Sequence, residues 1–342
     1  MDFSIAALLA QDGLTNGAIY CLLALALVLV FAVTRVIFVP QGEFVAFTVL
    51  TLAAFEQNKL PGTVWLLLAL GVTAAVAEVL TYRSDVRRML RAMAGSALPS
   101  MVAAALVWGV HAMQAGFLLQ VLATVLAVTA MGPAVYRLAF QPVATAPVLT
   151  LLIVSVAVHF VLTGLGLLFF GAEGARTSAF TNETFSIGGI NISGQSLLVY
   201  AFTAVLVVVM GLFFKYTLFG KALRATAANR TGARLVGVSP NFAGSLSITL
   251  AAAIGAMSGL LIGPITTVYY DSGFLVGLKG FVGAIVGGLA SYPIAAAGAI
   301  FVGLIESFSS FWASAYKEVI VFTLILPILL WRSLTTHHHE EE

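Results

Sequence analysis

The sequence consists largely of apolar runs of about 20 residues, separated by short breaks that carry glycine, proline or charge. A run of this length is long enough to cross a bilayer as a helix. Because lipid offers no hydrogen bonds to an open backbone, only helices and closed barrels span membranes. A barrel would need segments of alternating hydrophobicity, which these runs lack. The pattern therefore predicts an all-α, polytopic transmembrane helical bundle.

Composition excludes the soluble alternative. Of 342 residues, 61% are hydrophobic and only 9% are charged, and the mean hydropathy is +1.06. An ordinary soluble domain is about 25% charged, because its surface is covered with polar side chains. The single cysteine, Cys21, lies inside the first apolar run and excludes a disulfide framework or a cysteine-rich metal site.

The breaks predict about 9–11 spans. Two of them, 42–57 and 274–290, are short and are alternatively re-entrant segments. The candidate spans are 14–34, 42–57, 62–82, 97–113, 116–136, 147–170, 196–215, 242–263, 274–290, 292–312 and 318–332.

Basic residues predict the orientation. Short cytoplasmic loops carry an excess of Lys and Arg, and with the N-terminus outside, twelve of the sixteen basic residues fall on the inner side. The outer side holds Lys59, Arg176 and Lys317, and Lys279 lies within a span. We therefore expect the N-terminus outside and the C-terminus in the cytoplasm.

Two connecting loops are long. The outer loop, 171–195, alternates Phe and Ile with Gly, Asn and Ser, which suits a short hairpin or an irregular cap. It either meets an extracytoplasmic partner or is a solvated connector.

The inner loop, 215–241, has an apolar side with Leu223, Ala227, Leu235 and Val236 and a basic side with Lys221, Arg224, Arg230 and Arg234. This pattern predicts one or two short amphipathic helices that join near 230–232 and lie on a partner protein or on anionic lipid.

The inner loop also resembles a known element. The segment GKALRATAANRTGARLVGVSP, with Ala227-Ala228, Gly232 and Ser239-Pro240, is similar to the cytoplasmic coupling loop of ABC importer permeases. The resemblance implies that this loop docks on an ATP-binding subunit. The residues expected to couple the two subunits are Gly220, Arg224, Ala227, Ala228, Gly232, Arg234, Gly237 and Pro240.

Three further stretches resemble the permeases of branched-chain amino acid importers. They are GLTNGAIYCLLALALVLVFAVTRVIFVPQGEF from Gly13, LKGFVGAIVGGLASYPIAAAGAIFVGLIESF from Leu278 and YKEVIVFTLILPILLWR from Tyr316. The resemblance implies a bacterial inner-membrane subunit that forms the translocation path. Its implied partners are cytoplasmic ATP-binding subunits, a second homologous permease or a second copy of this chain, and a periplasmic substrate-binding protein. The resemblance also implies that this chain binds no cofactor, because the partner subunits bind and hydrolyse the ATP.

The sequence departs from that family in two places. Residues 60–112 look like an insertion of two spans, and the final histidines and glutamates, 337–342, are typical of a disordered tail. We therefore expect a single permease domain over 1–336, with the coupling loop at 215–241.

No constellation of residues predicts catalysis. His111 and His159 stand alone in apolar runs, and Gly220-Lys221 lacks the remainder of a phosphate-binding loop. We therefore expect a transport subunit that is not an enzyme and has no ATPase site of its own.

Charges inside spans are costly and are functional candidates by default. Glu306 lies near the middle of its span, Lys279 is close enough to the outer surface to snorkel, and Glu78 lies near the inner end of an inserted span. For Glu306 the alternatives are an interhelical ion pair or hydrogen bond and contact with substrate. Glu43 follows Pro40-Gln41-Gly42, which separates two apolar runs. Its carboxylate either caps the start of the next helix or faces the translocation path.

Glycines recur every four residues, which gives their helices flat faces. Such faces either pack closely or form the sliding walls of a path for a small apolar solute. The candidate path residues are Gln41, Gly42, Glu43, Gly255, Gly259, Gly263 and Glu306. Gly283 and Gly287 show the same spacing.

The predicted function is the translocation of branched-chain or related hydrophobic amino acids. A permease for urea or short amides is one alternative, because related systems share the scaffold. An ion-coupled secondary carrier is another, and Glu306 is the carboxylate that such a carrier would use.

Overall fold

The structure is a computed structural model that describes residues 3–81, 85–187 and 190–335. Arg83 and the tail 337–342, which is predicted to be disordered, lie outside the described residues. The long helices are α1 (Phe3–Thr34), α3 (Thr63–Thr81), α6 (Phe117–Val135), α7 (Val148–Phe170), α8 (Gly194–Tyr216), α11 (Pro240–Ile262) and α13 (Tyr292–Trp312). The shorter helices are α2 (Gln41–Glu56), α4 (Val86–Ser96), α5 (Leu98–Ala112), α9 (Leu218–Ala228), α10 (Arg230–Leu235), α12 (Ser272–Val286), α14 (Lys317–Thr323) and α15 (Ile325–Thr335).

The polytopic helical bundle is confirmed. Within the described residues, seven helices are long and apolar enough to cross a membrane, or eight if α4 and α5, bent by 44°, form one span. This is fewer than the expected 9–11, and the difference lies in short segments. Helix α2 has 16 residues and α12 has 15, and at 1.5 Å per residue both fall short of the ~30 Å hydrocarbon core. The expected span 318–332 is divided into α14 and α15.

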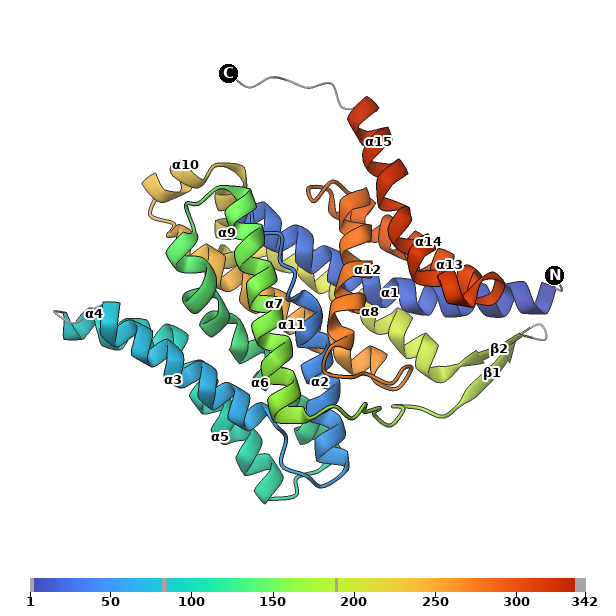
Figure 1. Cartoon of the computed structure of the whole chain (residues 1–342), viewed down its shortest axis with the longest axis horizontal. Coiled ribbons are helices and arrows are strands. Elements are labelled where there is room, and N and C mark those ends of the chain that lie inside the picture. Colours follow the sequence, from blue (N-terminus) through green and yellow to red (C-terminus); the bar gives the residue numbers. More distant parts are fainter. Residues whose placement is uncertain (1–2, 82–84, 188–189, 336–342) are drawn as a thin grey trace.

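Helix α1 runs from the middle of the bundle to its right-hand edge, where the N-terminus lies (Figure 1). It packs most extensively on α13 and also on α11 and α12. Helices α3, α4 and α5 form one flank, and α8 lies on another side of the bundle, next to the hairpin (Figure 1). Helices α3 and α5, from the segment predicted to be an insertion, pack on each other and on α6.

Glycines allow backbones to touch in this core. A Cβ at Gly42 of α2 would lie 1.7 Å from the carbonyl oxygen of Gly273 in α12, and one at Gly303 of α13 would lie 2.4 Å from backbone atoms of Gly13 and Gly17 in α1. No larger residue fits at these crossings without moving a helix. Close approach of this kind is how helices associate in lipid, where apolar burial supplies little driving force.

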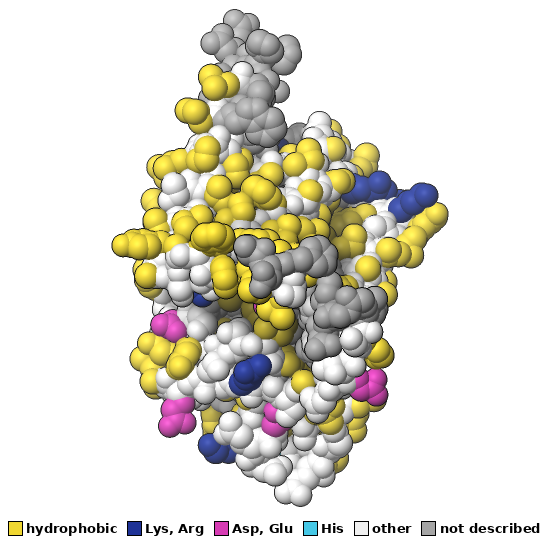
Figure 2. Space-filling view, turned by 90° about the vertical axis from the view of Figure 1, so that its right-hand side faces the viewer, with side chains coloured by type: hydrophobic (Ala, Val, Ile, Leu, Met, Phe, Trp, Pro, Cys, Tyr) yellow, Lys and Arg dark blue, Asp and Glu magenta, His cyan; other side chains and the backbone are white. Residues whose placement is uncertain are grey.

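The outer loop forms the predicted short hairpin. Strands β1 (Thr184–Ile187) and β2 (Ile190–Ser193) pair antiparallel, with Thr184 opposite Ser193. They lie beside the N-terminal part of α1 (Figure 1). Figure 2 views the molecule from this side and shows hydrophobic side chains over the upper part, whereas the acidic side chains gather in the lower part.

Candidate functional site

The segment predicted to be a coupling loop folds as two short helices, α9 and α10, that break at Asn229. Each helix begins at a polar cap: the Thr217 hydroxyl accepts from Gly220 N–H, and the Asn229 side chain accepts from Gly232 N–H at 2.8 Å. Ser239 caps α11 in the same way, followed by Pro240 at the first helical position. Such caps satisfy N–H groups that have no partner inside the helix. Of the one or two short helices that the sequence predicts here, the structure has two, and they join at Asn229, next to the expected 230–232.

The predicted apolar side of this segment divides into a buried part and an exposed part. Leu223 is buried, as expected, in a cluster with Leu29 and Val33 of α1 and Ala243 of α11. Leu235 and Val236, in contrast, are 84% and 78% exposed. The chain turns away after α10, at Gly237 with a φ of +89°, so these two side chains leave the packed face. They form an exposed apolar tip, Leu235–Val236, at the end of α10.

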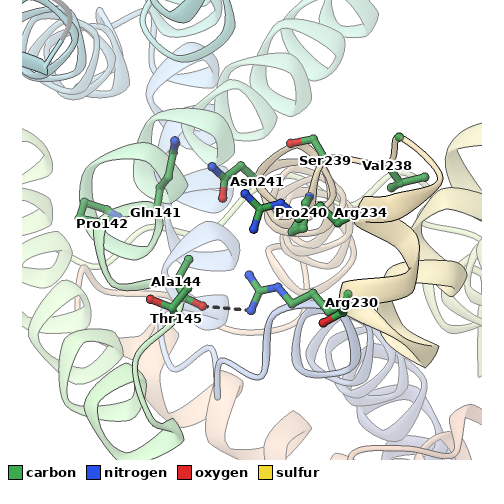
Figure 3. A pocket seen from close by; sticks show the side chains of 12 residues that line it. Gln141, Pro142, Ala144, Thr145, Arg230, Arg234, Val238, Ser239, Pro240 and Asn241 are labelled. Atoms are coloured by element: carbon green, nitrogen blue, oxygen red, sulfur yellow. Dashed lines mark hydrogen bonds between the residues drawn. The ribbon is translucent and has the colours of Figure 1, made fainter.

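A cavity of about 650 Å³ lies beside the tip, between α10, the start of α11 and the stretch 141–145. In Figure 3, Arg230 and Arg234 approach it from one side and Gln141 and Thr145 from the other. Arg230 donates a hydrogen bond of 3.0 Å to the carbonyl oxygen of Ala144. Arg234 is exposed and, within the described residues, forms no ion pair.

The structure divides the predicted coupling residues into two groups. Arg234, Gly237 and Pro240 line the cavity, and Arg224 and Ala228 are exposed beside it on α9. The other three make contacts inside this chain. Gly220 is buried, and a Cβ there would lie 2.3 Å from the Phe213 carbonyl oxygen, so it permits the sharp return from α8 to α9. Ala227 packs on the Leu223 cluster, and Gly232 donates to the Asn229 cap.

The residues proposed to line a path are packed against one another. A Cβ at Gly255 or Gly259 of α11 would lie 2.9 Å or less from side chains of α2, and one at Gly263 would lie 2.6 Å from Thr177. The Gln41 amide donates to the carbonyl oxygen of Ala251 at 2.9 Å. None of the seven lines any of four cavities with volumes of about 230 to 650 Å³ in the described part of the chain. In this conformation the glycine faces form closed helix contacts, and the same holds for Gly283 and Gly287, which face Ala299 and Ala295.

Glu43 does not cap α2 through its side chain. It stands in the first turn, but its carboxylate lies 2.6 Å from Nδ1 of His159 in α7. The His159 ring in turn stacks on Phe274 of α12, with centroids 4.5 Å apart. Both side chains are buried, and Glu43 Oε2 has no partner among the described residues. His159, predicted to stand alone, is therefore half of an interhelical polar pair, 116 residues from Glu43 in sequence.

Glu306 forms the interhelical ion pair that was one of its two predicted roles. Lys279 of α12 donates to it at 2.6 Å and to Glu318 of α14 at 3.1 Å, and Tyr20 of α1 donates to its second oxygen at 2.6 Å. Lys279 is only 6% exposed, so it does not snorkel as expected. This network ties four helices together, and pairing is what makes such charges tolerable at membrane depth.

A third buried carboxylate, Glu78 of α3, binds Arg137 through two hydrogen bonds of 2.6 and 2.8 Å. Arg137 lies in the π-helical turn η1 (Tyr136–Phe140), which follows α6 and leads into the 3-10 turn η2 (Gln141–Val143). Ser96 of α4 donates to the same carboxylate at 3.0 Å. Neither partner could be identified from sequence spacing, because the pair joins residues 59 positions apart.

The opposite end of the bundle carries a cavity of about 510 Å³ between α1 and the outer loop. Asp12, Asn16, Arg176 and Glu183 are among its lining residues. Arg176 donates twice to the carbonyl oxygen of Pro264, at 2.9 and 2.6 Å, just after the break at Gly263. Both charge signs therefore occur in the lining of this cavity.

Comparisons with known proteins find relatives of this chain among transport permeases. The chain is 28% identical over 209 residues to the high-affinity branched-chain amino acid transport system permease protein LivH of Escherichia coli strain K12, covering 59% of this chain and 68% of that protein. It is 32% identical over 149 residues to the corresponding permease BraD of Pseudomonas aeruginosa, covering 43% of this chain and 48% of BraD. No solved structure matches the chain.

The family described as branched-chain amino acid transport system / permease component matches residues 89–329. This range contains α9, α10 and the helices that hold Glu306 and Lys279. It covers well over half of the 342 residues. The chain therefore belongs to the branched-chain amino acid transport permease family.

Proposed function

We propose that this chain is the membrane subunit of an ABC importer and that α9, α10 and the apolar tip dock on a separate ATP-binding subunit. The observation that carries the proposal is the tip itself: Leu235 and Val236 are exposed beside a polar, arginine-lined cavity. An apolar projection with a polar rim is the usual form of a protein interface. In this proposal the ATP is hydrolysed by the partner, and this chain binds no nucleotide.

Orientation follows from charge. The end of the bundle with α4, α9 and α10 carries most of the arginines, and such an excess is typical of the cytoplasmic side. We therefore place this end in the cytoplasm of a bacterial cell and the β1–β2 hairpin on the periplasmic side of the inner membrane. There the hairpin and the cavity with Asp12 and Arg176 face a substrate-binding protein.

The buried contacts of α9 suggest how movement is transmitted. Leu223 packs on Leu29 and Val33 of α1 and on Ala243 of α11, and Ala227 packs on the same cluster. A displacement of α9 by a closing ATP-binding subunit would therefore shift the C-terminal end of α1 and the N-terminal end of α11 together. Since α11 also contacts α2 through Gly255 and Gly259, the tilt would reach the proposed path between α2 and α11.

The proposed cargo is a branched-chain or related hydrophobic amino acid. The support is that LivH and BraD are permeases of branched-chain amino acid transport systems, together with the apolar, glycine-rich contact between α2 and α11. The cavity at the outer end offers both an arginine and carboxylates, which match the two charges of an amino acid. Urea and short amides carry neither charge, so they remain the second candidate.

Co-purification tests the docking claim. Leu235→Gln should remove apolar contact with the ATP-binding subunit encoded beside this chain and abolish its co-purification from mild detergent. Because Leu235 is 84% exposed, the change should leave the melting temperature of the permease unaltered. Met113→Gln, at a side chain that is 82% exposed in the turn after α5, is the matched control.

Two results would separate the alternatives. Equal recovery of the ATPase with Leu235→Gln and Met113→Gln would contradict docking at the tip. If transport persists while Leu235→Gln or the bulkier Gly232→Glu removes the ATPase, an ion-coupled carrier is supported instead. The ligand retained by the neighbouring binding protein, leucine or urea, decides between the two cargo classes.

A further inference from the structure

A second cavity of about 490 Å³ adjoins the cavity beside the tip and shares Gln141, Ser239 and Asn241 with it. Its walls come from α4, from the turn η1 and from the first turns of α11. Helix α4 lies in the segment 60–112 that the sequence predicts to be an insertion, although the family match, which begins at residue 89, includes most of this helix. The cavity is therefore built partly from a segment to which the proposed transport function gives no task.

The charged residues that line this cavity are three arginines and one glutamate, which gives a positive balance. Arg88 and Arg91 approach it from α4. Arg88 shares an exposed ion pair with Asp85 at 3.0 Å, whereas Arg91 is exposed and, in the described part of the chain, has no ion-pair partner. Of the described residues that line the cavity, the one carboxylate is Glu78, which Arg137 neutralises.

Backbone and hydroxyl groups add further affinity for an anion. The 23-residue helix α11 begins at the cavity wall with its Ser239 cap, and a helix N-terminus attracts negative charge. Tyr136 also lines the cavity. It is 2% exposed, and its hydroxyl has no hydrogen-bond partner among the described residues. A buried hydroxyl without a partner is uncommon and points to a ligand group that completes it.

The cavity lies where candidate spans end. Glu78 is in the last turn of α3, Arg137 lies near the end of the candidate span Phe117–Val143, and α11 begins at Pro240. This places the cavity at the level of lipid headgroups. Helix α4 fits the same level, because Val86 and Leu90, one turn apart, are 61% and 57% exposed beside its arginines. A basic helix with an exposed apolar side lies in the membrane interface.

We propose that this cavity binds the phosphate headgroup of an anionic phospholipid. The phosphate would lie between Arg91, Arg88 and the N-terminus of α11, and the acyl chains would lie against Val86 and Leu90. Arginine is well suited to this role because its guanidinium binds phosphate oxygens in a fixed geometry. A soluble phosphate offers the same oxygens but has no acyl chains to cover the exposed leucine and valine. The lipid would thus connect α4 with α11, the helix that follows α9 and α10.

Lipid titration of the full chain tests this proposal. Delipidated protein in a neutral detergent is titrated with phosphatidylglycerol and, separately, with phosphatidylcholine, and bound lipid is counted by native mass spectrometry. Phosphatidylglycerol should bind more tightly than phosphatidylcholine. Arg91→Gln should weaken its affinity about fivefold, the change expected for ~1 kcal/mol per arginine near an anionic lipid surface. Arg87→Gln is the matched control, because Arg87 is exposed on the same helix but does not line the cavity.

Three outcomes would overturn the proposal. The first is an equal loss of affinity in Arg91→Gln and Arg87→Gln, which would show attraction to the helix as a whole. The second is equal affinity for the two lipids. The third is binding of inorganic phosphate that depends on Arg91 while phosphatidylglycerol does not bind, which would assign the cavity to a soluble anion. Because none of these measurements involves an ATPase, they can fail without affecting the proposed coupling role.

Discussion

Helices α1 and α8 are equally apolar but lie in opposite surroundings. Their most apolar 18-residue stretches have mean hydropathies of 2.6 and 2.7, yet 89% of that stretch is buried inside the protein in α1 and 11% in α8. Helix α1 presents Gly13 and Gly17 to the backbone of α13, whereas α8 carries a run of valines from Val207 to Val209. Hydropathy thus predicts membrane location, and small residues distinguish a helix that faces protein from one that faces lipid.

The contrast extends to polar groups and to movement. Helix α1 supplies Tyr20 to the Lys279–Glu306 network, which fixes it to α12 and α13. Helix α8 leads directly into α9 and the docking segment, and few of its residues are buried. We infer that the part of α1 around Tyr20 belongs to the rigid centre of the permease, and that α8 and the C-terminal end of α1 can follow the movement of α9. The predictions below test this difference, beginning with the largest expected effect.

Lys279→Met should be the most destabilising of the changes. It leaves Glu306 buried without its cation, and removing one partner of a buried ion pair costs about 3–5 kcal/mol. We expect a large fall in the melting temperature in detergent. The double variant Lys279→Met/Glu306→Leu should recover much of the loss, because the buried carboxylate is removed with its cation. Glu318, the other partner of Lys279, has a side chain that is 34% exposed and lies 4.0 Å from Lys317. A double variant as unstable as the single one would show that the network does not carry the stability of this region.

Gly303→Ala should destabilise by about 1–3 kcal/mol, the usual cost of overpacking, because its new methyl group would meet the backbone of α1. Gly211→Ala in α8 is the matched control, since a Cβ there meets nothing within 4 Å. We expect the control to be neutral or stabilising, because Ala favours helix over Gly by up to about 1 kcal/mol. Thermal unfolding of the two variants in one detergent compares them, and equal destabilisation would remove the distinction between α1 and α8.

Asn229→Ala should have a smaller and local effect. The Asn229 side chain caps α10 through Gly232 N–H, and loss of such a cap costs roughly 1 kcal/mol. Hydrogen exchange should accelerate in 230–235 and stay unchanged in α1. If exchange in 230–235 is unaffected, another contact holds α10.

Val208→Leu in α8 should be almost silent. Val208 is 59% exposed, and substitutions at such sites usually change stability by less than about 0.5 kcal/mol. Its melting temperature should match that of the unchanged protein. A clear loss would indicate that this face of α8 is covered by another subunit and not by lipid.

The sequence predicted the parts of this molecule that local chemistry decides. Apolar runs predicted the helical bundle, and the amphipathic pattern of 215–241 predicted one or two short helices, of which the structure has two. The hairpin at 184–193 was one of two predicted forms of the outer loop. These features depend on residues a few positions apart.

Features that depend on distant residues were not predictable. Glu43 and His159, or Glu78 and Arg137, meet only because whole helices cross. The pattern placed Leu223, Leu235 and Val236 on one apolar side, but it does not show that Leu223 is buried within the chain and that the other two are exposed. The short helices α2 and α12 were counted as spans because composition alone does not fix how far a helix reaches. Which residues contact substrate stays a prediction.

ATP-driven uptake tests the central claim most directly. Proteoliposomes would contain this chain with the ATP-binding subunit and the binding protein encoded beside it, and accumulation of labelled leucine would be measured. We predict uptake that requires ATP, persists with a protonophore and with Met113→Gln, and is lost with Leu235→Gln. Leucine uptake by this chain alone, driven by a proton gradient without ATP and unchanged by Leu235→Gln, would contradict the account.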